Sequence, residues 1–244
     1  MKPRTGEQQD AHRPRQARRL RNLTTIALAA AFVLATVAAA HGVDTAGQTS
    51  HGAGPPGQET APMVHLPPGL VGDPVLIEGA TARLQRTDGG LITRTDSREL
   101  TPGHVQTLWW VIFNNPEECA TTPCGLDDLF VDAVEAACLA ADGAVTGGSG
   151  RVSFSDRLAI GEWRDSCLPH FGGVDHGLRD PHGAEVHLMV HDHGPLQPGL
   201  VPEMRSTFAG GCDFDDPDYP LGTFGVVPQQ TGQCATIQAA LFLP

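Results

Sequence analysis

The densest group of chemically reactive side chains lies in the C-terminal third of the chain. Six of the 11 histidines fall between positions 170 and 193. In a strand, successive side chains point to opposite faces, so the segment 185–193 would present two different surfaces. Its apolar face would consist of Val186, Leu188 and Val190. Its second face would carry the following chemically reactive set: Glu185, His187, Met189, His191 and His193.

Imidazole, thioether and carboxylate groups are ligands that copper and zinc accept. At about 3.3 Å per residue, His187 and His193 would lie about 20 Å apart along a straight strand, too far to share an ion. His191 and His193, about 7 Å apart on the same basis, can converge on one ion. A third ligand would then be an aspartate or a preceding histidine (His170, His176 or His182). The same face also suits the solvent-facing side of an ordinary sheet, and both interpretations stay open.

A second cluster of candidate ligands follows Cys212. Four carboxylates occur within six residues, and Ca²⁺ takes oxygen ligands of this kind; they are Asp213, Asp215, Asp216 and Asp218. Pro217 and the lack of a closing glutamate exclude an EF-hand register. A calcium site and a solvated acidic loop both fit this segment.

No motif for covalent or hydrolytic catalysis accompanies these clusters. The segment 147–151 lacks the second glycine of a G-x-S-x-G turn. The chain also has no phosphate-binding loop and no H-E-x-x-H zinc motif. The sequence therefore favours a binding or structural role over an enzymatic one.

The N-terminus has the pattern of an export signal. Seven of the 16 basic residues precede an uncharged apolar run at positions 23–40, which ends in small residues. This order is typical of a secretory signal peptide. At 18 residues the run is marginal for a bilayer-spanning helix, so an uncleaved membrane anchor is the alternative. We expect a signal peptide at 1–40, a flexible Gly/Pro-rich linker at 41–72 and one domain at 73–244.

Removal of the leader changes the charge of the chain. Residues 41–244 hold nine arginines and 26 acidic residues, a net charge of about −17. Nucleic acids and anionic lipids require a basic surface, so neither is an expected partner. Any membrane contact would come from an uncleaved leader.

All six cysteines lie after the leader. An even number of cysteines in an exported chain predicts disulfides. Six cysteines allow 15 pairings, and we favour sequential pairing: Cys119–Cys124, Cys138–Cys167 and Cys212–Cys234. The spacings do not match a zinc knuckle.

Short alternating segments between turn signals predict strands. Residues 75–87 and 91–95 flank Asp88-Gly89-Gly90 and predict a β-hairpin. Residues 105–113 are apolar throughout and predict a central strand buried on both faces. Further strands are expected at 151–160, 184–193 and 235–242, a short helix is expected at 126–130, and 133–140 fits either a helix or a strand.

These elements predict an all-β domain, an antiparallel β-sandwich stabilised by disulfides, with short helices in its loops. The sandwich would be immunoglobulin-like or Cu/Zn superoxide dismutase-like. His191-Asp192-His193 is similar to the H-x-H that Cu/Zn superoxide dismutases carry on a sandwich strand. That similarity covers three residues and bears on the fold alone.

A wider resemblance rests on several separate segments. The stretch 107–117, then Cys119, Cys124-Gly125 and Asp128-Leu129, resembles a group of secreted bacterial proteins. So do Ala184–Leu188, His193-Gly194-Pro195 and Gly210-Gly211-Cys212. The resemblance implies a common secreted fold over residues 75–244, including a Cys119–Cys124 bond, and implies no activity.

The leading hypothesis is therefore an acidic module, secreted or tethered to the surface, with a non-enzymatic binding or structural role. A copper- or zinc-binding protein using the H-x-H strand is the first alternative. A calcium-stabilised domain is the second.

Overall fold

Strands account for most of the regular structure of residues 57–212 and 234–244, the parts of the chain that the computed structural model describes. The expected leader lies outside the described residues. The strands are β1 (Gln58–His65), β2 (Val75–Thr87), β3 (Gly90–Ser97), β4 (His104–Phe113), β5 (Ala136–Val145), β6 (Val152–Ala159), β7 (Glu185–Pro195) and β8 (Ala235–Phe242). Short helical turns join them: η1 (Pro68–Leu70), η2 (Pro116–Glu118), η3 (Leu126–Phe130), η4 (Asp132–Val134), η5 (Leu168–Phe171) and α2 (Val201–Met204). Within the described ranges, no helix is long and apolar enough to cross a membrane.

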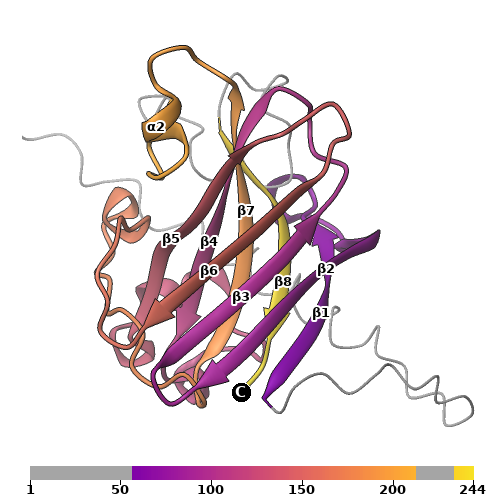
Figure 1. Cartoon of the computed structure of the whole chain (residues 1–244). Coiled ribbons are helices and arrows are strands. Elements are labelled where there is room, and N and C mark those ends of the chain that lie inside the picture. Colours follow the sequence, from indigo (N-terminus) through magenta and orange to yellow (C-terminus); the bar gives the residue numbers. More distant parts are fainter. Residues whose placement is uncertain (1–56, 213–233) are drawn as a thin grey trace, which may run out of the picture.

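The eight strands form one antiparallel sheet in the order β5-β4-β7-β8-β1-β2-β3-β6. The sheet curls on itself, so that β2, β3 and β6 pass in front of β4 and β7 (Figure 1). Its two end strands approach each other: the backbone N–H of Ser155 in β6 donates to Oδ2 of Asp142 in β5 at 3.0 Å. The all-β antiparallel prediction is confirmed. A sandwich of two sheets is not confirmed, because the sheet is continuous and nearly closes into a barrel.

Two apolar clusters lie on opposite faces of this sheet. The inner cluster receives side chains from all eight strands and includes Leu84, Trp110 and Phe154. The outer cluster lies between β4, β5, β7 and β8 and the loops that cover them, and includes Trp109 and Phe208. Every residue of β4 is buried, which confirms the prediction of a central strand buried on both faces.

The hairpin predicted at 75–95 is confirmed, with Thr87 of β2 paired to Gly90 of β3. The short helix expected at 126–130 is the 3₁₀ helix η3. The ambiguous segment 133–140 divides, because η4 ends at Val134 and β5 begins at Ala136.

The expected linker is wrong over residues 58–65, which form β1 between β2 and β8. This strand has few large apolar residues and contains Pro62, which hid its alternation. The register of β1 against β2 shifts between Pro62 and Val64, and a proline is tolerated at such an irregularity. Met63 is fully buried in the inner cluster.

All three disulfides follow the sequential pairing: Cys119–Cys124, Cys138–Cys167 and Cys212–Cys234. They are consistent with an extracytoplasmic protein, since disulfides persist in oxidising compartments. The first closes the loop between β4 and β5. The second joins β5 to the start of η5, and the third joins the segment after α2 to the start of β8.

Candidate functional site

Strand β7 places its histidines as the alternation predicted. Val186, Leu188 and Val190 lie in the inner cluster. Met189 lies in the outer cluster, on the same face as His187, His191 and His193. Pairing with β4 on one side and β8 on the other holds this strand in the middle of the sheet.

This histidine face is not the wet side of the sheet. His187, His191 and His193 are each no more than 2% exposed. The physical reason is that long connections fold over the outer face and bring their own apolar side chains to it. Phe208 stacks on the His191 ring at 4.4 Å and meets Trp109 edge-on at 5.1 Å.

The His193 ring is held at both nitrogens. Its Nδ1 donates to the carbonyl oxygen of Gly210 at 2.7 Å, which fixes the proton on Nδ1. Its Nε2 then accepts from the Thr107 hydroxyl at 2.8 Å. The Thr107 oxygen in turn accepts from Trp109 Nε1 at 2.7 Å. A chain of three side chains therefore orients this imidazole.

The His191 ring is held at one nitrogen. Its Nδ1 lies 3.0 Å from the Thr236 hydroxyl at the start of β8. Its Nε2 points toward Sγ of Cys212, at 3.9 Å. Sγ of Cys212 also lies 3.4 Å from Nδ1 of His193, so both rings face the same sulfur atom.

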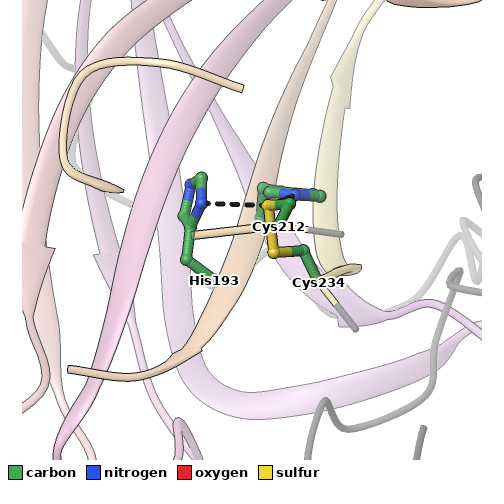
Figure 2. Close-up of side chains that lie close together, drawn as sticks. His193, Cys212 and Cys234 are labelled. Atoms are coloured by element: carbon green, nitrogen blue, oxygen red, sulfur yellow. Dashed lines mark hydrogen bonds between the residues drawn. A yellow bond between two sulfur atoms is a disulfide. The ribbon is translucent and has the colours of Figure 1, made fainter. Parts of the chain in front are cut away.

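The structure thus brings a disulfide to the H-x-H pair. Figure 2 shows His193 facing Cys212, which is bonded to Cys234. The potential ligand atoms of four residues all lie within 4.8 Å of one another; these are His191, His193, Cys212 and Cys234. From the sequence alone, these cysteines are expected only in a disulfide, and the third ligand is expected to be an aspartate or a preceding histidine.

Burial lowers the pKa of both histidines. Desolvation lowers the pKa of His193 to about 4. Desolvation also holds the pKa of His191 well below its usual value, and the neighbouring His193 lowers it further. Both rings are neutral at pH 7, and a neutral imidazole is the form that binds metals.

His187 does not join this group. Its Nε2 lies 2.6 Å from Oε1 of Glu185, and the same carboxylate oxygen accepts the backbone N–H of Cys124 at 2.8 Å. His187 and Glu185 therefore attach the Cys119–Cys124 loop to the beginning of β7. Asp213, Asp215 and Asp218, the calcium candidates, lie outside the described residues.

A buried histidine–aspartate pair, not expected from the sequence, joins β4 to β7. His104 begins β4 and places Nδ1 at 2.9 and 3.1 Å from the two carboxylate oxygens of Asp192. Gly194 N–H also donates to this carboxylate. Only the spacing of alternate residues along β4 could have placed His104 on the inner face.

A cleft lies where β1 and β8 separate. These strands pair at Val64–Ala239 and His65–Gln238, and the Leu66 N–H donates to the Ile237 carbonyl oxygen just after them. Beyond this point they diverge around a cavity of about 380 Å³. Its walls are mainly apolar: Ala61, Pro62 and Val64 of β1, residues 239–243 of β8 and its C-terminal continuation, and Pro123 of the Cys119–Cys124 loop.

No protein-family model matches the chain, and neither the curated proteins nor the solved structures include a significant match.

Proposed function

We propose that the chain is an exported, non-enzymatic binding module, and that the cleft between β1 and β8 takes an extended apolar peptide segment. Export is supported by the basic and apolar pattern of residues 1–40 and by the three disulfides. The observation that carries the binding role is the early end of the β1–β8 ladder.

Because the β1–β8 pairing ends early, β1 and β8 each have one backbone edge that faces the cleft. β1 is paired along its other edge with β2, and β8 with β7. A strand edge presents backbone N–H and C=O groups that an added strand can satisfy. The apolar walls would bury alternate side chains of such a peptide, which is how strand addition gains specificity.

The charge at the cleft does not oppose a neutral peptide. Glu59 is the acidic residue among the cleft-lining side chains, and it pairs with Arg86 Nε at 2.6 Å. Arg86 also donates to the carbonyl oxygens of Pro181 and Ala184. Through Arg86, the Glu59 side chain of the cleft is therefore tied to the segment that leads into β7.

A titration with a blocked Thr/Val hexapeptide tests this proposal. We expect the backbone amide resonances of β1 and β8 to shift selectively, with the other strands unchanged. Thr60 is exposed and lines the cleft, so Thr60→Trp should fill it and weaken binding at least 10-fold. Ser155→Trp, at an exposed position on β6, is the matched control and should bind normally. Shifts elsewhere, or none at millimolar peptide, would contradict the proposal.

A second function, binding of zinc or copper, is supported by a separate observation. Two imidazoles and two sulfur atoms lie within 4.8 Å of one another. This site lies on the outer face beneath Phe208 and shares no residue with the β1–β8 cleft. The two functions can therefore be tested independently.

A further inference from the structure

We infer that the Cys212–Cys234 disulfide is a redox gate on a zinc site: its reduction frees two thiolates, which bind one Zn²⁺ together with His191 and His193. This inference rests on the second proposed function and states which ligands, which metal and which redox state it requires. The argument begins with the geometry of the four side chains.

The ligand atoms already lie close to the arrangement that zinc needs. In a tetrahedral site with Zn–N of about 2.0–2.1 Å and Zn–S of about 2.3 Å, neighbouring ligand atoms stand roughly 3.3–3.8 Å apart. Sγ of Cys212 lies 3.4 Å from Nδ1 of His193 and 3.9 Å from Nε2 of His191. The contact that must change is the bond between the two sulfur atoms themselves.

Each histidine also has the outer partner that a metal ligand requires. A ligating imidazole normally hydrogen-bonds through its other nitrogen, which fixes the orientation of the ring. Thr236 holds Nδ1 of His191 and leaves Nε2 toward the sulfur. Thr107 holds Nε2 of His193, while Nδ1 lies 3.4 Å from the sulfur and would exchange its hydrogen bond to the Gly210 carbonyl oxygen for the metal. For His193 the ring proton would move from Nδ1 to Nε2, where the Thr107 oxygen accepts it.

The disulfide form lacks the charged ligands. The thiolate is the form of cysteine that binds metals, and neither sulfur of a disulfide is a thiolate. An external dithiol supplies two electrons and two protons: it becomes a cyclic disulfide, and the Cys212–Cys234 bond becomes two thiols. Zinc then displaces the two thiol protons, giving a neutral Zn(Cys)₂(His)₂ centre. The gate therefore opens under reducing conditions and closes on oxidation.

Thiol–disulfide exchange requires that an external thiol can reach one of the two cysteines, and Cys212 and Cys234 differ in their exposure. Cys212 is half-buried, whereas Cys234 is 1% exposed. Cys212 is thus the more accessible residue of the pair, and an incoming thiolate would form the mixed disulfide with it and release the Cys234 thiolate. The other long-range disulfide is buried at both ends, with Cys138 and Cys167 at 2% and 5%.

The preceding glycines fix the position of Cys212. A Cβ at Gly210 would lie 2.4 Å from the Glu203 carbonyl group, so only glycine allows this close approach. Gly211 has φ +73°, a conformation that other residues rarely adopt. The sulfur is thus delivered to the histidine pair by a closely packed turn beside α2.

The test compares zinc content in two redox states of the purified chain. One sample is kept oxidised, and the other is treated with a dithiol that is then removed anaerobically. We expect one equivalent of zinc in the reduced protein and none in the oxidised protein. Cobalt in place of zinc should give the thiolate charge-transfer and tetrahedral ligand-field bands in the reduced sample only.

Variants locate the metal. His191→Ala/His193→Ala and Cys212→Ser/Cys234→Ser should each lower affinity at least 100-fold. Thr236→Val, which removes only the outer hydrogen bond, should lower it about 10- to 100-fold. Cys119→Ser/Cys124→Ser is the matched control, since it removes a disulfide with no histidine pair beside it, and should retain full zinc binding.

Each outcome decides between the proposals. Equal zinc in both redox states would overturn the gate and leave the metal-binding function standing. No zinc in either state would overturn the gate and the zinc-binding function together, without bearing on the peptide cleft. Zinc retained by the Cys212→Ser/Cys234→Ser variant, or bound only with loss of the near-ultraviolet circular dichroism of the fold, would place the metal elsewhere and overturn the inference.

Discussion

His191 and His193 are neutral because folding removes them from water, and no carboxylate of residues 57–212 or 234–244 hydrogen-bonds to either ring. The groups that face them are threonine hydroxyls, a backbone carbonyl, Phe208 and the Cys212 sulfur. None of these stabilises a positive charge enough to offset desolvation. Their pKa values are therefore lower in the folded chain than in the unfolded chain.

This shift predicts a loss of stability in acid. Above pH 6.5 His193 is neutral in both states, so its contribution is fully present. As the pH falls from 6.5 toward 4, His193 binds a proton in the unfolded chain but stays neutral in the folded chain. The His193 pKa of about 4 corresponds to a loss of about 2–3 kcal/mol by pH 4.5, and His191 acts in the same direction.

Urea unfolding of the oxidised, metal-free protein at pH 7.0 and 4.5 measures this loss. His193→Gln keeps a hydrogen-bonding side chain and removes the titration, so it should show a smaller pH dependence than the unmodified chain. An equal pH dependence in both proteins would assign the loss to other groups.

At the residue scale the sequence predicted part of the site. The alternation along 185–193 correctly separated His191 and His193 from Val190. It could not show that both rings are buried, because the covering residue Phe208 is distant in sequence. It also could not show Cys212 as a neighbour of the histidines, since pairing arguments assigned it to Cys234 alone.

At the scale of elements, the contact between β5 and the turn after α2 depends on one glycine. The Gly143 carbonyl accepts from Nε and Nη2 of Arg205 at 2.8 and 2.6 Å. A Cβ at Gly143 would lie 2.0 Å from the Arg205 carbonyl oxygen. Backbone meets backbone here, so no side chain can move aside to relieve a clash.

Gly143→Ala should therefore displace the turn after α2 and destabilise the fold by about 1–3 kcal/mol. Gly147→Ala is the matched control, because a Cβ there meets nothing within 4 Å. Chemical denaturation compares the two free energies of unfolding, and hydrogen exchange at Met204 and Arg205 reports the displacement. Equal stability of both variants would mean that the contact contributes little.

The elements themselves differed in how well the sequence predicted them. β4 was evident in the sequence because apolar and aromatic residues dominate it, as expected of a strand that is buried along its whole length. β1 was hidden because its pairing, and not its composition, makes it a strand: Gln58 to Pro62 pair with β2 although three of these five residues are polar. β5 was ambiguous because small residues such as Ala136 and Ala137 suit a helix as well as a strand.

At the scale of the whole molecule, the disulfides restrain a sheet whose end strands close without a continuous ladder. Cys138–Cys167 spans 29 residues and Cys119–Cys124 spans five. In the chain-entropy model these loops correspond to about 3–4 and about 2 kcal/mol of stabilisation.

Replacing both cysteines of a pair by alanine tests this difference. Cys138→Ala/Cys167→Ala should lower the free energy of unfolding more than Cys119→Ala/Cys124→Ala, as measured by urea denaturation at pH 7. The reverse order would show that the short loop contributes mainly through native contacts, such as the hydrogen bond from Cys124 N–H to Glu185.

The sequence by itself determined which segments alternate, which turns join them and that the cysteines pair in an all-β chain. These are local properties, since period-two patterns and turn residues depend on neighbours a few positions away. Only the tertiary structure decided that the strands form one nearly closed sheet, that β1 and β8 part to leave a cleft, and that Cys212 lies between two histidines. Those features depend on contacts between distant segments, and burial by a remote loop leaves no pattern in the strand that it covers.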